Sequence, residues 1–377
     1  MNTFFHAVIV FACVGTVAAG AYKVRVVDRV LTGRPLVENA PLSNPYSKTA
    51  CAGSPCTNVL NPAWLPTDDG APGSTDGGLF IRLATPTCHL SVIVWLRALP
   101  KSSGLGFETP SDALVLKDGP PGEEHVALGM DPRAIYRPLT GIYYVFYQTG
   151  WNRTRRTQIS STRTPQYLSS WKRFKHTMFD KDDCGTTLWF PEDDDDRIAI
   201  EDKKAYAIVT FGTLRGGNLS LASSDDGMQT WKNMGNFLYT RRGHWDNATL
   251  SAGPPPMKLS DDNWLMLYNV DNKWPVQAPK PFPWFGRCAL GWAILDKDNF
   301  THILARAEEP LVYAEKPWEL HGTTDRVVYS DGIRDEGNDT FTVFAGGADT
   351  VIEGIRIQVE VANGDYLVKP QKVYIDP

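Results

Sequence analysis

Apolar and polar residues alternate with a period of two along much of this chain, which is the pattern of β-strands that bury one face. The clearest runs combine aromatic and β-branched residues, and Gly, Pro and Asp separate them; they are residues 79–83, 91–95, 205–209 and 264–268. No run of helical length has the spacing of an amphipathic helix. The pattern therefore predicts an all-β chain.

A weak internal repeat indicates how these strands are organised. A turn that contains Ser precedes Trp171, and a similar turn precedes Trp231, 60 positions further on. This spacing is close to the length of one four-stranded propeller blade, and about five such units fit after the first 20 residues. Length alone would suggest two domains, but all-β domains often exceed the usual size. We therefore predict a single five-bladed β-propeller over residues 21–377.

The first 20 residues have a composition of their own. An apolar stretch over residues 4–17 is followed by Ala18, Ala19 and Gly20, although the amino end lacks Lys and Arg. Residues 1–20 therefore resemble a secretory signal peptide, because the apolar stretch is shorter than the roughly 20 residues that span a bilayer. We expect a secreted or luminal, N-glycosylated protein. Its Asn-x-Ser/Thr sequons begin at Asn152, Asn218, Asn247, Asn299 and Asn338.

Charge and cysteine content narrow the partners and the compartment. A net charge of −5 and a pI of about 5.8 argue against nucleic acid or an anionic membrane as partner, because no concentrated basic surface is encoded. Of six cysteines, Cys13 lies in the predicted signal peptide. Among the other five, Cys51 and Cys56 flank a Gly-Ser-Pro turn and are the expected local disulfide. No Cys or His spacing indicates a zinc site, and we predict no metal or cofactor.

The segment Asp131-Pro132-Arg133 is the strongest candidate for a chemical centre. It places a carboxylate and a guanidinium on either side of a proline, shortly before an apolar and aromatic run at residues 141–147. Proline fixes its own φ and disfavours helix at the preceding residue, so we expect Asp131 to be extended at the mouth of a strand. The alternative is a surface turn in which the Asp and the Arg form a local ion pair.

Further short motifs accompany this segment in a fixed order. They are Asn61-Pro62, Phe190-Pro191-Glu192, Trp245-Asp246 and the sequences at residues 78–83, 223–231, 253–256, 264–268, 291–296 and 346–349. Together, from residue 61 to residue 349, these motifs resemble glycoside hydrolase family 130, and the chain is identified as a secreted, divergent member of that family. The resemblance implies a five-bladed propeller that acts on β-mannosides, in many members as a phosphorylase.

The resemblance also implies roles for individual residues. Asp131 matches the catalytic acid, which protonates the glycosidic oxygen through a sugar hydroxyl while the nucleophile enters from the opposite face. Polar residues that match the lining of the central pocket, where they would bind the mannosyl ring, are Asn61, Arg82, Arg133 and Asp349. Asp349 could alternatively cap a turn of its blade. Trp245 and Asp246 either line the same pocket or belong to the core of a blade.

Four positions depart from the pattern of the family's phosphorylases. Gly185 stands where a Lys is usual, Phe211 where an Arg is usual, Asn269 where a His is usual, and Met130 where a Glu commonly precedes the Asp-Pro-Arg segment. A phosphate dianion needs several cationic or N–H donors to offset its desolvation. We therefore expect water to be the nucleophile, in an inverting glycosidase that acts on β-mannosides.

Inversion by water requires a second carboxylate about 6.5–9.5 Å from the acid, and Asp246 and Glu192 are the candidates for this base. Two other functions stay open: a β-mannoside phosphorylase, and a propeller that binds glycan without cleaving it. In each case the expected partner is a mannose-containing oligosaccharide or glycan.

Two more segments invite a functional interpretation. The four aspartates at residues 193–196 could bind calcium, although such charge runs are usually solvated hairpin tips. Residues 272–286 contain four prolines together with Trp274 and Trp284. This segment either folds over the pocket, where it would offer a ring for a sugar to stack on, or forms a rigid surface connection.

Overall fold

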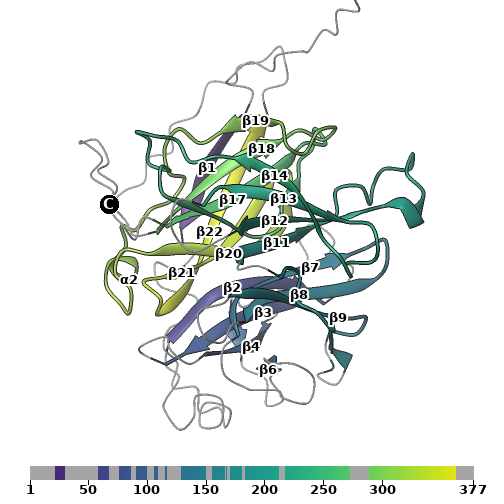
Figure 1. The fold of residues 1–377 in the computed structure, drawn as a ribbon. Coiled ribbons are helices and arrows are strands. Elements are labelled where there is room, and N and C mark those ends of the chain that lie inside the picture. Colours follow the sequence, from purple (N-terminus) through teal and green to yellow (C-terminus); the bar gives the residue numbers. More distant parts are fainter. Residues whose placement is uncertain are drawn as a thin grey trace, which may run out of the picture.

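The computed structural model is built almost entirely of β-strands (Figure 1). It describes residues 22–29, 58–67, 76–85, 91–99, 106–108, 115–116, 129–149, 155–165, 167, 170–180, 183–211, 217–271 and 288–361. The described strands form five antiparallel sheets arranged as a five-bladed β-propeller, so the predicted fold class is confirmed. The expected signal peptide, the expected disulfide between Cys51 and Cys56, and residues 272–286 lie outside the described residues.

In each blade, strands that follow one another along the chain are mostly hydrogen-bonded neighbours. The first sheet contains β2 (Asn58–Pro66), β3 (Gly77–Ala84), β4 (Ser91–Ala98), β5 (Phe107–Glu108) and β6 (Val115–Leu116). The second contains β7 (Met130–Arg137), β8 (Ile142–Thr149), β9 (Arg156–Thr162) and β10 (Lys172–Arg173). The third contains β11 (Asp183–Trp189), β12 (Ala205–Phe211), β13 (Leu219–Ser224) and β14 (Lys232–Leu238). The fourth contains β15 (Thr249–Ala252), β16 (Met257–Lys258), β17 (Trp264–Asp271), β18 (Cys288–Leu295) and β19 (Ile303–Arg306).

The fifth blade joins the two ends of the described chain. It contains β20 (Val328–Gly337), β21 (Thr340–Gly347), β22 (Val351–Val361) and, at its outer edge, β1 (Tyr22–Arg29). β1 pairs antiparallel with β22, from Tyr22 opposite Val361 to Arg29 opposite Ile355. Figure 1 shows these two strands side by side although they come from opposite ends of the sequence. The pairing closes the ring of blades.

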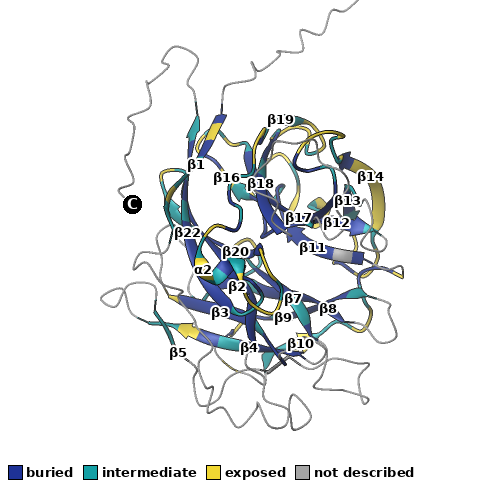
Figure 2. Cartoon of the chain, turned by 90° about the vertical axis from the view of Figure 1, so that its left-hand side faces the viewer, coloured by how far each residue is buried: buried dark blue, intermediate teal, exposed yellow. Residues whose placement is uncertain are grey.

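The inner strands are buried on both faces, because each blade packs against two neighbours. In β17, Trp264, Met266 and Tyr268 belong to an apolar cluster shared with the third blade, whereas Leu265 and Leu267 belong to a cluster shared with the fifth. The period of two in the sequence therefore separates two apolar interfaces, not one buried and one solvated face. Exposed residues gather on outer elements, and most of β14 is exposed (Figure 2).

Helical structure within the described ranges is short. It consists of the 3₁₀ helix η3 (Ile200–Asp202) and the helix α2 (Pro317–Leu320). Neither reaches the length and apolar character that a membrane-spanning helix needs. The turn before α2 is held by Glu319, whose carboxylate accepts hydrogen bonds from the N–H groups of Glu315 and Lys316.

The innermost strands of the blades, β2, β7, β11, β15 and β20, pack around the axis and share one irregularity. β2, β7, β11 and β20 lose register with the neighbouring strand early in their length. In the fourth blade, β15 pairs with β17 as far as Ala252, and pairing with β17 resumes at Met257 of β16. Bulges of this kind bend a strand and re-aim its side chains. The residues that fall on these breaks are Asn61, Asp131, Gly185, Gly253 and Asp331.

Candidate active site

Asp131 lies on the bulge at the start of β7 and faces Arg82, which belongs to β3 in the neighbouring blade. Arg82 Nη1 and Asp131 Oδ1 are 3.3 Å apart, and the two side chains are 11% and 14% exposed. The ion pair therefore joins two blades. It is not the local pair within a surface turn that was the alternative interpretation of the Asp-Pro-Arg segment.

The expected extended backbone at Asp131 is wrong. Its φ is +48°, in the left-handed region, although Pro132 follows. The ladder between β7 and β8 loses register between Met130 and Arg133, so the bulge overrides the usual effect of a proline on the preceding residue. Such a backbone is uncommon for an aspartate, and strain of this kind is concentrated where a side chain has to be aimed.

Arg133 is buried, and each of its nitrogen atoms is directed at a protein oxygen. Nη1 donates to the backbone carbonyl of Asp131 at 3.0 Å, Nε to that of Gly253 at 2.9 Å, and Nη2 to that of Ala252 at 2.6 Å. The residue is 1% exposed. The resemblance implied that Arg133 lines the sugar pocket. In the structure it links the second and fourth blades, and its contact with a sugar stays a prediction.

Asp331, on the bulge of β20, completes this group and was missed by the sequence reasoning. Its Oδ1 lies 2.7 Å from Arg133 Nη2, in an ion pair that is not aligned as a hydrogen bond, and its Oδ2 accepts a 2.8 Å hydrogen bond from Asn61 Nδ2. Burial raises the pKa of Asp331 to about 7, against the opposing charge of Arg133. A lone carboxylate within the apolar run at residues 327–333 was the signal that could have revealed it.

Two hydroxyl groups extend this group of residues towards the third blade. Ser251 Oγ and Tyr329 Oη are 2.7 Å apart, and Tyr329 also forms a hydrogen bond with Arg133. The backbone of Gly185, at φ +68°, approaches so closely that a Cβ there would clash with Ser251 Oγ. Glycine at residue 185 therefore meets a requirement of both space and backbone conformation.

The other two positions aligned with cationic residues of phosphorylases serve the fold. Asn269 is buried and bridges β17 and β20, because its side chain exchanges two hydrogen bonds of 2.9 Å with the backbone of Ser330. The ring of Phe211 packs on Phe179, with centroids 4.9 Å apart. Within the described part of the chain, Arg82 and Arg133 are the cations whose contacts reach Asp131.

Asp246, one of the two candidate bases, lies in the protein core, where its contacts stabilise the fold. It is fully buried and pairs with Arg241 at 3.0 Å and Arg306 at 2.5 Å, while Tyr268 donates its hydroxyl proton to it at 3.1 Å. These contacts tie the segment before β15 to β19. Both cations and the phenol already engage this carboxylate. The geometry therefore does not favour Asp246 as a catalytic base that would act together with the acid Asp131.

Glu192, the second candidate base, follows β11 at the end of the strand away from Gly185. Its carboxylate accepts hydrogen bonds from the backbone N–H of Lys204 at 2.8 Å and from the hydroxyl of Tyr206 at 2.5 Å. Both contacts hold the turn between β11 and β12. The position of Glu192, at the far end of an innermost strand, separates it from Asp131 along the axis.

Asp349 and Trp245 were the remaining candidates for the pocket. Asp349 is part-exposed in the turn between β21 and β22, at φ +56°. Because Gly347 pairs with Val328 at the start of β20, this turn lies at the same end of the fifth blade as Asp331. A role in sugar binding stays a prediction. Trp245 is 3% exposed and stacks on Tyr268 with centroids 6.0 Å apart, which assigns it to the core between blades.

Three of the four aspartates at residues 193–196 form ion pairs. Asp193 pairs with Arg137 at 2.6 Å, and the next two aspartates pair with Lys258 at 3.3 Å and with Arg197 at 2.7 Å. Among the described residues, no group of three or more His, Cys, Asp or Glu side chains is placed to hold a metal ion. The run follows β11 as a turn, as the interpretation of a hairpin tip requires.

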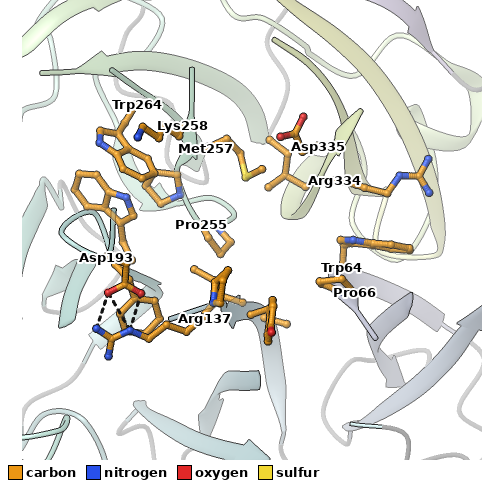
Figure 3. A pocket seen from close by; sticks show the side chains of 18 of the residues that line it. Trp64, Pro66, Arg137, Asp193, Pro255, Met257, Lys258, Trp264, Arg334 and Asp335 are labelled. Atoms are coloured by element: carbon orange, nitrogen blue, oxygen red, sulfur yellow. Dashed lines mark hydrogen bonds and ion pairs between the residues drawn. The ribbon is translucent and has the colours of Figure 1, made fainter. Parts of the chain in front are cut away.

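A separate cavity of about 290 Å³ is lined by the later parts of the innermost strands, at the end of the axis away from Asp131 (Figure 3). Trp64 of β2, Arg137 of β7, Met257 of β16 and Arg334 of β20 contribute to its walls. Arg137 donates hydrogen bonds of 2.7 and 2.6 Å to the carboxylate of Asp193, and Figure 3 marks this contact with dashed lines. This cavity is distinct from the group of residues around Asp131.

Comparisons of the sequence assign the chain to a known group of enzymes. Residues 124–363 match the model of glycoside hydrolase family 130, which is described as β-1,4-mannooligosaccharide phosphorylase. Over 224 residues the chain is 28% identical to a 1,2-β-oligomannan phosphorylase from Thermoanaerobacter sp. (strain X514), with 59% of this chain and 65% of that protein covered. The match therefore spans less than two thirds of that relative.

Solved structures share the fold. The β-1,2-mannobiose phosphorylase of Listeria innocua, in complex with β-1,2-mannobiose, matches with a TM-score of 0.66 at 16% identity, over 88% of this chain and 96% of that chain. A second structure was reported with the finding that the family contains hydrolases of β-1,2-mannosidic linkages in Candida mannan. It matches with a TM-score of 0.66 at 17% identity, over 88% and 92% of the two chains.

The chain thus shares the propeller fold of these solved structures. The chain belongs to glycoside hydrolase family 130, as the sequence motifs indicated. The expectation that water is the nucleophile is contradicted, because the family model and the curated relatives from Thermoanaerobacter and Listeria are described as phosphorylases. Neutral residues at positions 185, 211 and 269 did not justify that expectation, since hydroxyl and N–H groups also donate to phosphate.

Proposed function

We propose that this protein is a β-mannoside phosphorylase, which transfers a mannosyl unit from a β-mannoside to inorganic phosphate with inversion. The phosphorylase relatives support this function, and the observation that carries it is the Arg82–Asp131 pair on the axial bulge. The glycosidic C1–O bond breaks, a bond from C1 to a phosphate oxygen forms, and the leaving oxygen receives the proton of Asp131. The products are α-mannose 1-phosphate and the shortened saccharide.

Asp131 has the placement that a general acid needs. Arg82 contacts Oδ1 at 3.3 Å, so Oδ2 is the atom that we assign to the proton. The side chain is 14% exposed, which gives a substrate access to it from the axis. Because its backbone is fixed by Arg133 at 3.0 Å, the carboxyl group is pre-oriented before the substrate binds.

Phosphate would take hydrogen bonds from Arg82 and from the hydroxyl of Tyr329. Arg133 donates to the Tyr329 oxygen, which leaves the phenolic proton for Ser251 or for a ligand. Arg133 itself is committed to protein oxygens at 2.6–3.0 Å. Fewer cations would therefore surround phosphate here than in phosphorylases with the usual Lys, Arg and His, and we expect a high KM for phosphate.

The test is to incubate the purified protein with β-1,2- and β-1,4-mannobiose, with and without phosphate, and to separate mannose 1-phosphate from free mannose. We expect mannose 1-phosphate only when phosphate is present, and none from the Asp131→Asn variant. Release of free mannose at the same rate without phosphate would refute the proposal. Binding of mannobiose without any turnover would also refute it, and would identify a glycan-binding propeller.

We also propose that the enzyme acts in the secretory pathway or outside the cell, which the composition of residues 1–20 supports. Asn299 and Asn338 are exposed, so both sequons are open to N-glycosylation. Expression in a eukaryotic secretory host should yield secreted protein that loses mass on treatment with an N-glycan amidase. Retention of the full-length chain inside the cell would contradict this localisation.

A further inference from the structure

We propose that Asp331 is a positioning residue that acts on Asp131 through Arg133. This inference rests on the proposed role of Asp131 as the acid, and it adds an account of how that acid is held. Asp331 itself does not contact the reacting atoms in this account. The argument depends on one unbroken series of contacts between the fifth and second blades.

The series begins at the buried carboxylate. Asp331 Oδ1 lies 2.7 Å from Arg133 Nη2, and Arg133 Nη1 donates to the backbone carbonyl of Asp131 at 3.0 Å. That carbonyl belongs to the residue whose φ is +48°. The Arg133 hydrogen bond therefore holds the left-handed backbone that turns the Asp131 carboxyl group towards Arg82.

Asp331 supplies a negative charge beside Arg133, which the other hydrogen-bond acceptors there do not carry. The carbonyl groups of Asp131, Ala252 and Gly253 accept hydrogen bonds but carry no net charge. A buried guanidinium is stable only when a counter-charge lies beside it. Asp331 provides that charge, and the 2.8 Å hydrogen bond from Asn61 fixes its other oxygen from the first blade. Both members of the ion pair are almost completely buried.

The same carboxylate gives the site a response to pH. Burial and the negative charge of Asp131 raise the pKa of Asp331 to about 7, against the opposing effects of Arg133 on β7, Asn61 on β2 and Arg82 on β3. Above that pH, the charged carboxylate holds Arg133 by an ion pair. Below it, the neutral acid keeps its shape but loses the attraction. We therefore expect the acidic limb of the kcat profile to follow Asp331.

The first test compares Asp331→Asn with the wild-type enzyme in phosphorolysis of β-mannobiose. Misplacement of the acid should lower kcat about 100-fold, and KM for the mannoside should change less than about threefold, because Asp331 does not contact the sugar. The acidic limb of the kcat profile should disappear. Glu353→Gln is the matched control: it replaces another fully buried carboxyl group of the same blade, on β22, by an amide and should leave kcat and its profile unchanged.

Loss of the counter-charge threatens folding of the single variant, so a second variant keeps the charge balance. Arg133→Met with Asp331→Asn removes both charges of this pair together and should melt cooperatively, yet show the same loss of kcat. A crystal structure of this double variant should show that Asp131 has left its positive φ. If the wild-type enzyme does not use phosphate, the proposed function fails while the structure still tests the positioning. Wild-type kcat in the folded double variant, or an unmoved Asp131, would overturn the inference.

Discussion

Arg29, in the first described strand, and Glu353, in the last, lie 3.6 Å apart inside the fifth blade, from Nη2 to Oε1. Glu319 of α2 contacts the same nitrogen, so two buried carboxylates share one guanidinium. Burial raises the pKa of Glu353 to about 8, the negative charge of Glu319 adds to this shift, and Arg29 opposes it. The closure of the propeller therefore contains an ionisable group that is neutral at pH 7.

This relationship predicts a stability that falls with rising pH. The Glu353 carboxyl group loses its proton near its ordinary pKa of 4.5 in the unfolded chain, but only near pH 8 in the folded one. Its stabilising effect is complete below the lower value and is lost as the pH rises through the upper one, at up to about 1.4 kcal/mol per pH unit. Denaturant unfolding between pH 5 and 8 measures the slope. Glu353→Gln should reduce it, and an undiminished slope in this variant would contradict the assignment.

Asp131→Asn should abolish turnover and leave saccharide affinity nearly intact. The amide keeps the shape of the side chain and its contact with Arg82, but it cannot deliver a proton. The expected loss in kcat is at least about 100-fold. Steady-state kinetics and calorimetric titration with mannobiose separate rate from affinity. A variant as active as the wild type would move the acid to another residue.

Tyr329→Phe should weaken phosphate binding specifically. Removal of a hydrogen bond to a charged ligand costs about 1.5–3 kcal/mol, which corresponds to at least a tenfold rise in the KM for phosphate. The KM for the mannoside should change little. Tyr239→Phe, which removes an exposed hydroxyl elsewhere in the protein, is the control. Equal effects of both variants, or none from either, would exclude Tyr329 as a phosphate ligand.

Asp246→Asn should lower the stability of the protein and leave its catalytic rate unchanged. The change leaves the partly buried Arg241 and Arg306 beside a neutral group, and breaking a fully buried ion pair costs about 3–5 kcal/mol of unfolding free energy, which is the upper bound here. The rate per folded molecule should equal that of the wild type. Thermal melting and active-site-normalised kinetics measure the two quantities. A folded variant with kcat reduced tenfold or more would restore Asp246 to the list of functional residues.

The sequence predicted the fold class well because it records period two and turn residues directly. The short motifs added the order of the blades and the position of Asp131. The same information could not separate the two sides of a strand, since in β17 both Trp264 and Leu265 are buried against different neighbours. Propeller cores make every inner strand apolar, and the pattern then says little about which blade a residue faces.

The candidate site was predicted only in part, because its geometry depends on bulges. A register shift at Met130 and Arg133 gives Asp131 a positive φ that the following proline would not suggest. Asp331 was missed because its partners, Asn61 and Arg133, are remote in the sequence. The sequence made Asp246 look like a functional carboxylate, because the arginines that neutralise its charge can be recognised as its partners only in the folded structure.

The close approach of Gly185 to Ser251 constrains how this lineage can change. A side chain at position 185 would force Ser251 Oγ to rotate, and that rotation would break its 2.7 Å contact with Tyr329. A lysine at 185 and the Ser251–Tyr329 hydroxyl pair are therefore alternative occupants of one space. A side chain at residue 185 would also have to adopt the unfavourable φ of +68°, so glycine there meets two physical requirements at once. The residue at position 185 therefore determines whether the Ser251–Tyr329 hydroxyl pair can offer hydrogen-bond donors here.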